Sequence, residues 1–340
     1  MVLKFLLILL LFCSLKADSR DILVHIFSTQ EKLKTVFIQG SFSFEAPFKR
    51  RANNIIYKVN CKNKQIFFSG LPFKSSLFVL KGGYIKIRLI NNLERIYTGT
   101  VFIKAKPDCE LVLQNSIDEK TYIISVVGNE MPTNWPLEAL KAQSVLAQTR
   151  LLNSAKQPVL PDSTNEQSYK GLLANSSKVQ KAVQETWRQV LYYKNKPIKV
   201  FYHSTCGGQT SSGNYLKENY AYLSSVKCSY CGSSPFAKNK AVYIPALQIV
   251  QTDKAGRPIS VKFQNKLMSG YEFWLKAGQE WGWGKIPGTY YWANGNFIYS
   301  RGAGHGVGLC QWGAKGLADK GQKYSQILNY YFPEAKIKTL

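Results

Sequence analysis

The sequence predicts an α+β protein, in which a β-rich N-terminal part precedes a mixed helix and strand body that surrounds a cleft. Three patterns lead to this prediction: short β-branched and aromatic runs over 21–127, helical periodicity over 136–153, and a return of strand patterns after that helix. Since strands and helices do not alternate regularly, a βαβ array is not expected. The chain has 340 residues, 45% of them hydrophobic, which excludes global disorder and allows one large domain or two ordinary ones.

The predicted strands of the N-terminal part are apolar runs bounded by turn residues. The runs begin at Val36, Gln65, Leu77, Tyr84 and Thr100. Gly40, Gly70, the pair Gly82 and Gly83, and the pair Asn91 and Asn92 separate them. Short runs of β-formers with this punctuation are typical of strands joined by tight turns.

Helical periodicity is clearest over 136–153. One face of that helix would carry Leu137, Leu140, Ser144, Ala147 and Leu151, with Pro136 at its start, where a missing N–H costs nothing. We expect a second helix at 177–190 and a last one over Tyr324–Phe332, which stops at Pro333. Strand patterns return at 189–202 and across 241–299.

The first 17 residues are typical of a secretory signal peptide. Lys4 precedes an apolar run from Phe5 to Phe12 that is too short to span a bilayer, and Ala17 offers a cleavage site. An uncleaved membrane anchor is the alternative. With either outcome, we expect the body to be exported to the periplasm or cell envelope. The expected organisation is a signal peptide at 1–17, a β-rich part at 18–115 and a catalytic core at 116–340.

The net charge of +25 indicates an anionic polymer or surface as a partner. Nucleic acid, anionic lipid and cell-wall polymer all meet that description. Export argues against nucleic acid and favours the cell wall, and contact with a membrane is expected only if the signal segment is uncleaved. The chain has only three histidines, so a histidine-rich metal enzyme is not expected.

Six cysteines follow the signal segment, at positions 61, 109, 206, 228, 231 and 310. An even number in an exported chain permits disulfides, and we expect at least one within the group Cys206, Cys228, Cys231 and Cys310. Cys228 and Cys231 form a C-x-x-C pair, which is either a redox motif or half of a zinc site that Cys206, His203 or Cys310 would complete. We assign no metal ligand and no cofactor from the sequence.

Glu130 is the carboxylate that we single out as a candidate catalytic group. It lies between an apolar segment predicted as a strand, including Val126 and Val127, and the start of the 136–153 helix. One hypothesis is structural, because a helix N-terminus stabilises a nearby carboxylate. The other is catalytic, because apolar neighbours raise the pKa of a carboxyl group and make it a general acid. The two effects act in opposite directions on its pKa, so both hypotheses stay open.

Two further segments combine small polar residues with glycines. In the first, His203–Gly208, Cys206 and a histidine could form a nucleophile pair, although a buried or disulfide-bonded cysteine is the simpler interpretation. In the second, four alternating glycines at 302–308 precede Gln311 and surround His305. Their spacing is not that of a dinucleotide-binding loop, and it permits close approach of another backbone or of a ligand. A glycine-rich turn packed against a helix is the structural alternative.

These segments resemble, in order and spacing, the SpoIID/LytB domain family. The residues that carry the resemblance are Glu130–Pro132 with Trp135–Gln143, then His203–Gly208, then Gly304–Gly308 with Gln311–Ala314. The resemblance runs roughly from Asp21 to Phe332. It implies a peptidoglycan lytic transglycosylase that cuts glycan strands from which an amidase has removed the stem peptides. LytB-type members are described as amidase enhancers.

The resemblance places the family's catalytic glutamate on Glu130. We add Gln143, His203, Ser204, His305 and Gln311 as candidate substrate-binding residues. Two family features are missing. Gln148 stands where the family helix has an arginine, so Arg150 or another residue would have to replace it. Some members bind zinc in the loop after this helix, but residues 161–169 contain neither cysteine nor histidine.

The expected reaction needs one carboxyl group, which protonates the leaving oxygen and then accepts the proton of the sugar's own C6 hydroxyl, forming a 1,6-anhydro end. The expected partners are peptidoglycan glycan strands and an N-acetylmuramoyl-L-alanine amidase. Sporulation, division and wall remodelling are all open as the process. Two other functions stay open: a non-catalytic wall-binding enhancer of an amidase, and a thiol peptidase that uses Cys206 and a histidine.

Overall fold

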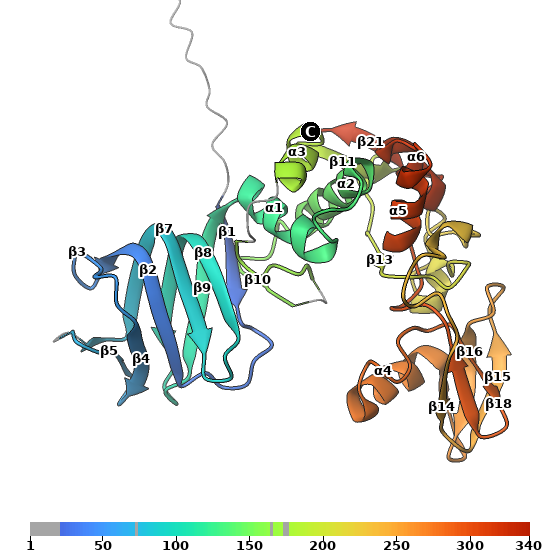
Figure 1. Ribbon diagram of the computed structural model, residues 1–340, viewed down its shortest axis with the longest axis horizontal. Helices are drawn as coiled ribbons and strands as arrows, with labels where there is room; N and C mark the ends of the chain where they lie inside the picture. Colours follow the sequence, from blue (N-terminus) through green and yellow to red (C-terminus); the bar gives the residue numbers. More distant parts are fainter. Residues whose placement is uncertain (1–20, 72–73, 164–165, 173–176) are drawn as a thin grey trace, which may run out of the picture.

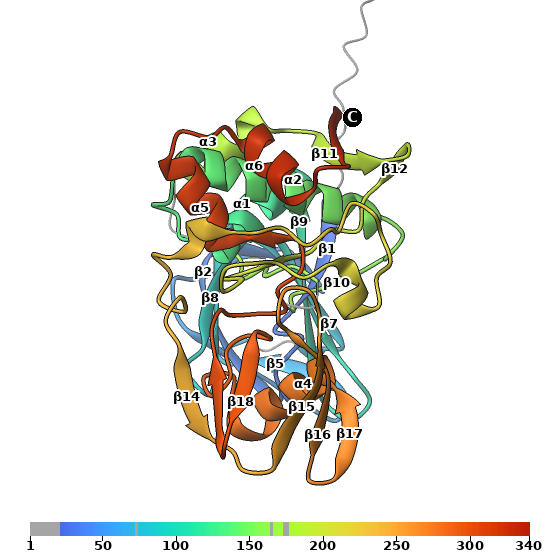
Figure 2. The same cartoon turned by 90° about the vertical axis from the view of Figure 1, so that its right-hand side faces the viewer.

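The computed structural model describes residues 21–71, 74–163, 166–172 and 177–340, so the expected signal peptide lies outside the described residues. The predicted α+β class is confirmed. A large sheet forms the N-terminal end, a layer of helices adjoins it, and a small unit of strands and one helix lies at the opposite end (Figure 1). Seen from the small unit, the helices lie at the top and the large sheet lies behind (Figure 2).

The N-terminal part is a ten-stranded sheet. The strands lie in the order β10-β1-β9-β8-β7-β2-β4-β5-β6, with β3 paired to β2. The strands are β1 (Asp21–Ile26), β2 (Thr35–Ala46), β3 (Arg50–Arg51), β4 (Tyr57–Lys62), β5 (Gln65–Phe68), β6 (Lys74–Ser75), β7 (Leu77–Leu89), β8 (Glu94–Ala105), β9 (Leu111–Asp118) and β10 (Leu160–Pro161). Strand β9 buries every second residue, as expected for a strand with one face on the core. Strand β10 comes from far along the chain and pairs parallel to β1.

The helical layer and the sheet share one apolar core. Its helices are α1 (Glu119–Glu130), α2 (Leu137–Asn153), α3 (Ser177–Glu185), α5 (Gln311–Asp319) and α6 (Tyr324–Tyr331). Short strands join distant parts of the chain around them: β11 (Gln189–Tyr193) pairs with β12 (Lys196–Pro197) and β21 (Lys336–Thr339), and β13 (Tyr202–His203) pairs with β20 (Leu309–Cys310). Two 3-10 turns, η1 (Gly213–Leu216) and η2 (Ser229–Cys231), lie between β13 and the small unit.

The small unit has its own apolar core. It contains two three-stranded sheets, β14-β19-β18 and β15-β16-β17, and one helix. Their bounds are β14 (Lys240–Tyr243), β15 (Leu247–Thr252), β16 (Pro258–Phe263), β17 (Lys266–Ser269), α4 (Gly270–Trp281), β18 (Tyr291–Asn294) and β19 (Phe297–Ser300). Ser269 and Glu272 form a capping box at the start of α4.

The helices predicted at 136–153 and 324–332 are confirmed as α2 and α6. The helix predicted at 177–190 is too long, because α3 ends at Glu185. Arg188 then adopts a left-handed conformation with φ of 64°, which ends the helical path. Val190 and Leu191 continue as a buried strand that pairs with β21.

Helix α1 is the main error of the sequence-based prediction, which extended the β-rich region to residue 127. Asp118 caps this helix by accepting a hydrogen bond from the Thr121 N–H at 2.9 Å. Its apolar residues, including Ile123, Val126 and Val127, are buried on more than one side, so they show no amphipathic period. A short run of buried β-branched residues cannot be told from a strand by periodicity alone.

The cysteine prediction is wrong in its location. Cys206, Cys228, Cys231 and Cys310 are free thiols, and the disulfide joins Cys61 to Cys109. Cys61 lies in β4 and Cys109 lies in the turn before β9, with their Cα atoms 5.3 Å apart, a separation within the usual range for a disulfide. Among the described helices, none is long and apolar enough to cross a membrane.

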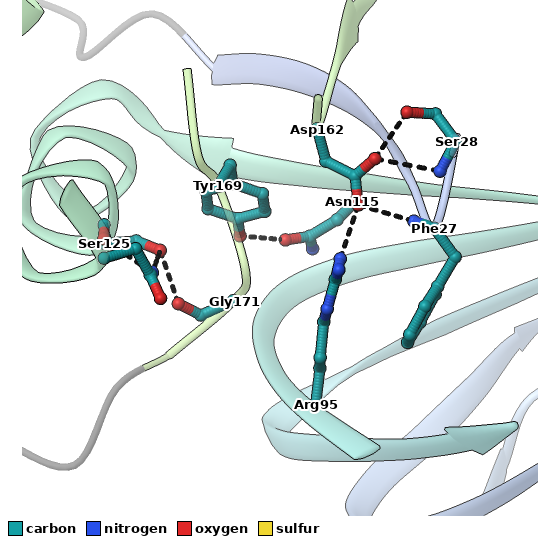
Figure 3. Close-up of polar contacts among 9 residues, drawn as sticks. Phe27, Ser28, Arg95, Asn115, Ser125, Asp162, Tyr169 and Gly171 are labelled. Atoms are coloured by element: carbon teal, nitrogen blue, oxygen red, sulfur yellow. Dashed lines mark hydrogen bonds and ion pairs between the residues drawn. The ribbon is translucent and has the colours of Figure 1, made fainter. Parts of the chain in front are cut away.

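A buried carboxylate attaches the segment 161–163 to the large sheet, and two contacts attach residues 169–171 (Figure 3). The side chain of Asp162 is fully buried and forms an ion pair with Arg95 of β8. Its two oxygens also accept the backbone N–H groups of Phe27 at 2.6 Å and Ser28 at 2.8 Å, together with the Ser28 hydroxyl. Further along the loop, the Tyr169 hydroxyl donates to Asn115, and the Gly171 carbonyl accepts from Ser125.

We expect Asp162→Asn to lower the free energy of unfolding by about 3–5 kcal/mol, the usual effect of breaking a buried ion pair. The new amide group would face N–H donors and would leave Arg95 without its counter-charge. Urea unfolding measures the change. Glu280→Gln is the matched control, because its ion pair with Lys276 is about half exposed and should contribute little. Equal stability of the two variants would contradict the anchoring role.

Candidate active site

Glu130 is the last residue of α1. The segment before it is therefore a helix and not the strand that the sequence predicted, and Glu130 lies at a helix C-terminus. The structural hypothesis for Glu130 required the N-terminal end of a helix, where the dipole favours negative charge. At the C-terminal end of α1 the dipole disfavours a carboxylate, so α1 itself does not supply the stabilisation that this hypothesis needs. Glu130 itself is half-buried.

Two hydrogen bonds hold Glu130 in place. The backbone N–H of Ser168 donates to Glu130 Oε1 at 2.9 Å. On the backbone side, Gln311 Nε2 donates to the Glu130 carbonyl oxygen at 3.1 Å. The carboxyl group is thereby tied to the segment after α2, and the backbone of Glu130 is tied to the start of α5.

Tyr202 links Glu130 to the glycine-rich segment. Burial, with the charge of Glu130 as the second cause, raises the pKa of Tyr202 well above its usual value, so the phenol stays protonated. Its backbone carbonyl accepts a hydrogen bond from His305 Nε2 at 2.9 Å. His305 Nδ1 in turn accepts from the Val307 N–H at 3.2 Å. These contacts define one tautomer of a neutral His305.

The two histidines of the site are adjacent and uncharged. Their ring centroids are 5.5 Å apart. Burial lowers the pKa of His305 to about 4 and that of His203 well below its usual value, so neither ring carries charge at neutral pH. His203 Nδ1 donates to the Val307 carbonyl at 3.1 Å, whereas its Nε2 is buried without a partner among the described residues.

The alternating glycines pack against another backbone, which is one of the two possibilities left open by the sequence. Strand β20 pairs parallel to β13, so that Tyr202 lies beside Leu309 and His203 beside Cys310. A Cβ atom on Gly308, whose φ is 72°, would lie 2.1 Å from the Phe201 carbonyl oxygen. One on Gly304, whose φ is 93°, would lie 2.9 Å from the Cβ atom of His203. Only glycine allows the two motifs to come together.

Gln148, at the position of the family arginine, takes no part in the site. It is buried, its Nε2 donates to the Thr186 carbonyl at 2.8 Å, and its Oε1 accepts from the Arg188 N–H at 2.7 Å. Arg150 lies on the site side of α2. Its charge acts on the pKa of both Tyr202 and His305, and its Nε lies 3.8 Å from a Glu166 carboxylate oxygen. Arg150 is therefore the cation that α2 brings to this region.

The two remaining candidate residues are Ser204 and Gln143, and within the described ranges neither side chain forms a hydrogen bond with Glu130. Ser204 is half-buried, and its carbonyl accepts the Trp312 N–H at 3.1 Å, next to Gln311. Gln143 is completely buried in α2, and both polar atoms of its amide have no partner among the described residues. The structure thus brings Glu130 and Gln311 into contact and joins His203 to His305. No hydrogen bond joins the Gln143 side chain to these residues within the part of the chain that the structure describes.

Three residues of this site are not among those predicted from the sequence: Ser168, Tyr202 and Glu166. Tyr202 had a signal, because it directly precedes His203 in the motif. Ser168 acts through its backbone N–H, which carries no signal in the sequence. Glu166 acts together with Glu130 on the pKa of the buried Tyr122, so it is a second carboxylate near the site. It is engaged by Arg150 and by the Ser154 hydroxyl.

A cluster of four thiols lies directly behind the histidine and glycine motifs. The sulfur atoms of Cys206, Cys228, Cys231 and Cys310 all lie within 4.8 Å of one another. Cys206 is completely buried, so it is not an accessible nucleophile. Among the described residues, these four cysteines form the group whose side chains could hold a metal ion.

Comparison with known proteins agrees with the resemblance of the motifs. A model of the Stage II sporulation protein family (SpoIID) matches residues 108–193, which include Glu130, Gln143 and Ser168. An uncharacterized protein of Brachyspira hyodysenteriae is 30% identical over 271 residues, covering 72% of each chain. Stage II sporulation protein D of Bacillus subtilis is 29% identical over 262 residues, covering 65% of this chain and 75% of that protein.

The amidase enhancer of Bacillus subtilis is also similar, with 27% identity over 276 residues that cover 61% of this chain and 39% of that protein. The relative from Brachyspira hyodysenteriae extends the likeness well beyond the region that the family model matches, over 72% of both chains. The motifs identified in the sequence, the family match and these relatives agree: the chain belongs to the SpoIID/LytB family.

Proposed function

We propose that this protein acts on the bacterial cell wall as a peptidoglycan lytic transglycosylase with Glu130 as its single general acid and base. The substrate would be the MurNAc–GlcNAc strand, with its stem peptides already removed, and the products would carry 1,6-anhydro ends. Relatives named for sporulation and for amidase enhancement support a role at the wall. An exported chain with its charge of +25 would meet that substrate outside the cytoplasm.

The observation that carries the proposal is the setting of the Glu130 carboxyl group. It is half-buried at a helix C-terminus, and one oxygen accepts the Ser168 N–H at 2.9 Å. Burial, followed by the charge of Glu130, raises the pKa of the Tyr202 phenol, so a protonated phenol is close to the carboxyl group. A fixed donor orients the carboxyl group, which suits a residue that must both give and take a proton.

The proposed reaction has two proton movements and no water. Glu130 as a carboxylic acid protonates the glycosidic oxygen, and the C1–O bond breaks through an oxocarbenium-like state. The C6 hydroxyl oxygen of the MurNAc residue then forms a bond to C1, and Glu130 as a carboxylate takes the hydroxyl proton. The net change converts one glycosidic bond into a 1,6-anhydro bond and a free hydroxyl, and it restores the acid.

The second candidate is a wall-binding enhancer of an amidase, favoured by the similarity to a protein named amidase enhancer. It would use the same surfaces without needing the Glu130 proton. The thiol peptidase has little support, because Cys206 is completely buried among three other thiols. Glu166 is a second carboxylate near Glu130. If it activated water, the product would be a hydrolysed glycan and not a 1,6-anhydro end.

We expect Glu130→Gln to fold and to bind sacculi but to lose about 10²–10⁴-fold in turnover, the usual contribution of general acid–base catalysis. The amide keeps a hydrogen-bond acceptor for the Ser168 N–H and removes the transferable proton. Mass spectrometry of products from peptide-free glycan measures turnover and identifies the 1,6-anhydro ends.

The matched controls are Glu138→Gln and Glu166→Gln. Glu138 lies in the next helix, where it bonds Lys141 and the Tyr324 N–H, so its variant should keep nearly full turnover. Glu166→Gln distinguishes the transglycosylase reaction from hydrolysis. Its turnover should fall only if the Glu166 carboxylate activates water. Full turnover by Glu130→Gln would remove the proposed mechanism. Amidase stimulation that survives in this variant without any glycan cleavage would favour the enhancer.

Binding to the wall should weaken as salt rises, because exposed charges are screened beyond about 10 Å at 0.1 M ionic strength. Pelleting of the protein with purified sacculi at increasing salt measures this dependence. Sacculi stripped of phosphate-bearing polymers are the control and should show a smaller salt effect. Pelleting that does not respond to salt would mean that uncharged glycan contacts alone hold the protein.

A further inference from the structure

Four cysteines from three separate segments converge on one point. Cys206 lies shortly after β13. Cys228 directly precedes the turn η2, and Cys231 is the last residue of that turn. Cys310 is the last residue of β20. Their sulfur atoms lie within 4.8 Å of one another. Three of the side chains are completely buried and Cys231 is 4% exposed. We propose that these four thiolates bind a structural zinc ion.

The spacing of the sulfurs suits a metal better than a covalent bond. Cys206 Sγ and Cys231 Sγ are 3.6 Å apart. Zn–S bonds of about 2.3 Å place the sulfurs of a tetrahedron about 3.8 Å apart. A disulfide would require about 2.05 Å. The same chain forms a disulfide between Cys61 and Cys109, whereas all four thiols of the cluster are free.

The ligand set is assembled partly by sequence and partly by the fold. Cys228 and Cys231 form the C-x-x-C half that is common in zinc sites. The other half has no such spacing, because Cys206 and Cys310 are brought together by the pairing of β13 with β20. Four cysteine ligands and no open position are the composition of a structural site, not of a catalytic one. His203 is not part of the group whose ligand atoms lie within 4.8 Å of one another, and four cysteines already complete a tetrahedron.

Hydrogen-bond donors surround the sulfurs as they do around bound thiolates. The Cys206 N–H and the Gly313 N–H each donate to Cys310 Sγ at 3.3 Å. The Gly208 N–H lies 3.4 Å from Cys206 Sγ, and the Tyr331 hydroxyl lies 3.1 Å from Cys228 Sγ. Such donors orient ligands and stabilise their negative charge. Cys310 also caps the N-terminus of α5, where the helix dipole favours a thiolate.

A buried arginine supplies a second, independent observation. Arg257 is only 1% exposed, and none of the ion pairs among the described residues includes it. Its guanidinium donates to the carbonyls of Cys206 and Gln209 and to the Ser211 hydroxyl, which in turn donates to Asp253. A buried cation needs compensating charge, and the Asp253 carboxylate is one source of it. Four thiolates and one Zn²⁺ carry a net charge of −2 beside this guanidinium, which also ties the small unit to the cluster.

The packing beside the sulfur atoms leaves no room for a side chain at position 313. A Cβ atom on Gly313 would lie 2.6 Å from Cys228 Sγ and 2.0 Å from the Tyr331 hydroxyl oxygen. The proposed ion would cross-link the turn η2 to the loops that carry His203 and Gln311. It lies behind the candidate active site, so its role would be to fix that wall and not to contact substrate. This inference does not depend on the proposed reaction.

Metal analysis of the purified full chain tests the proposal. We expect about one zinc per chain, and after exchange with Co²⁺ we expect visible bands of a tetrahedral thiolate complex. Peptide mapping after alkylation should find the thiols of Cys206, Cys228, Cys231 and Cys310 reduced, and protected until a chelator is added. Because the spectrum is taken on the unaltered protein, it does not depend on how a variant folds.

Cys231→Ser should lose most of the zinc and the thiolate bands of the Co²⁺ form, since three ligands remain. The double variant Cys61→Ser with Cys109→Ser is the matched control, and it should keep its zinc because its sulfurs lie outside the cluster. Two disulfides within the cluster would overturn the proposal. So would four reduced thiols with no metal after growth in zinc-supplemented medium, or iron in place of zinc.

Discussion

The buried carboxylate of Asp162 is the contact on which the geometry at Glu130 depends. It holds residues 161–163 against the large sheet by pairing with Arg95 and by accepting two backbone N–H groups (Figure 3). The Ser168 N–H that orients Glu130 lies a few residues further along the chain, in the described segment 166–172. The N-terminal sheet therefore contributes to the site without supplying a side chain to it, because it sets the position of the loop.

The pairing of β13 with β20 is the second constraint, and it organises the other side of the site. Glycines at 304 and 308 allow the two strands to approach so closely that His203, His305 and Gln311 share one small region. The same pairing brings Cys206 beside Cys310. In the arrangement that we propose, the pair of strands β13 and β20 positions both the candidate site residues His203, His305 and Gln311 and the zinc ligands. Loosening one of these groups would therefore disturb the other.

Charge is distributed unevenly between the surface and the site. Burial keeps His203 and His305 neutral and the Tyr202 phenol protonated, so these groups act through hydrogen bonds and not through charge. Arg150 adds a cation, which Glu166 partly balances. In the proposed function, the large positive surplus of the chain would serve binding to the wall polymer.

Periodicity and motif spacing are local properties of the chain, and they were enough to predict the α+β class, the helices α2 and α6, the family motifs and Glu130 as a candidate. The end of α3, the helical state of the segment before Glu130, the contact of the Ser168 N–H and the grouping of the four cysteines become visible only in the folded chain. Helix α1 is buried on several sides and so has no readable period. The other features join residues that are distant in sequence, and such contacts depend on packing and backbone hydrogen bonds that leave no pattern in a single sequence.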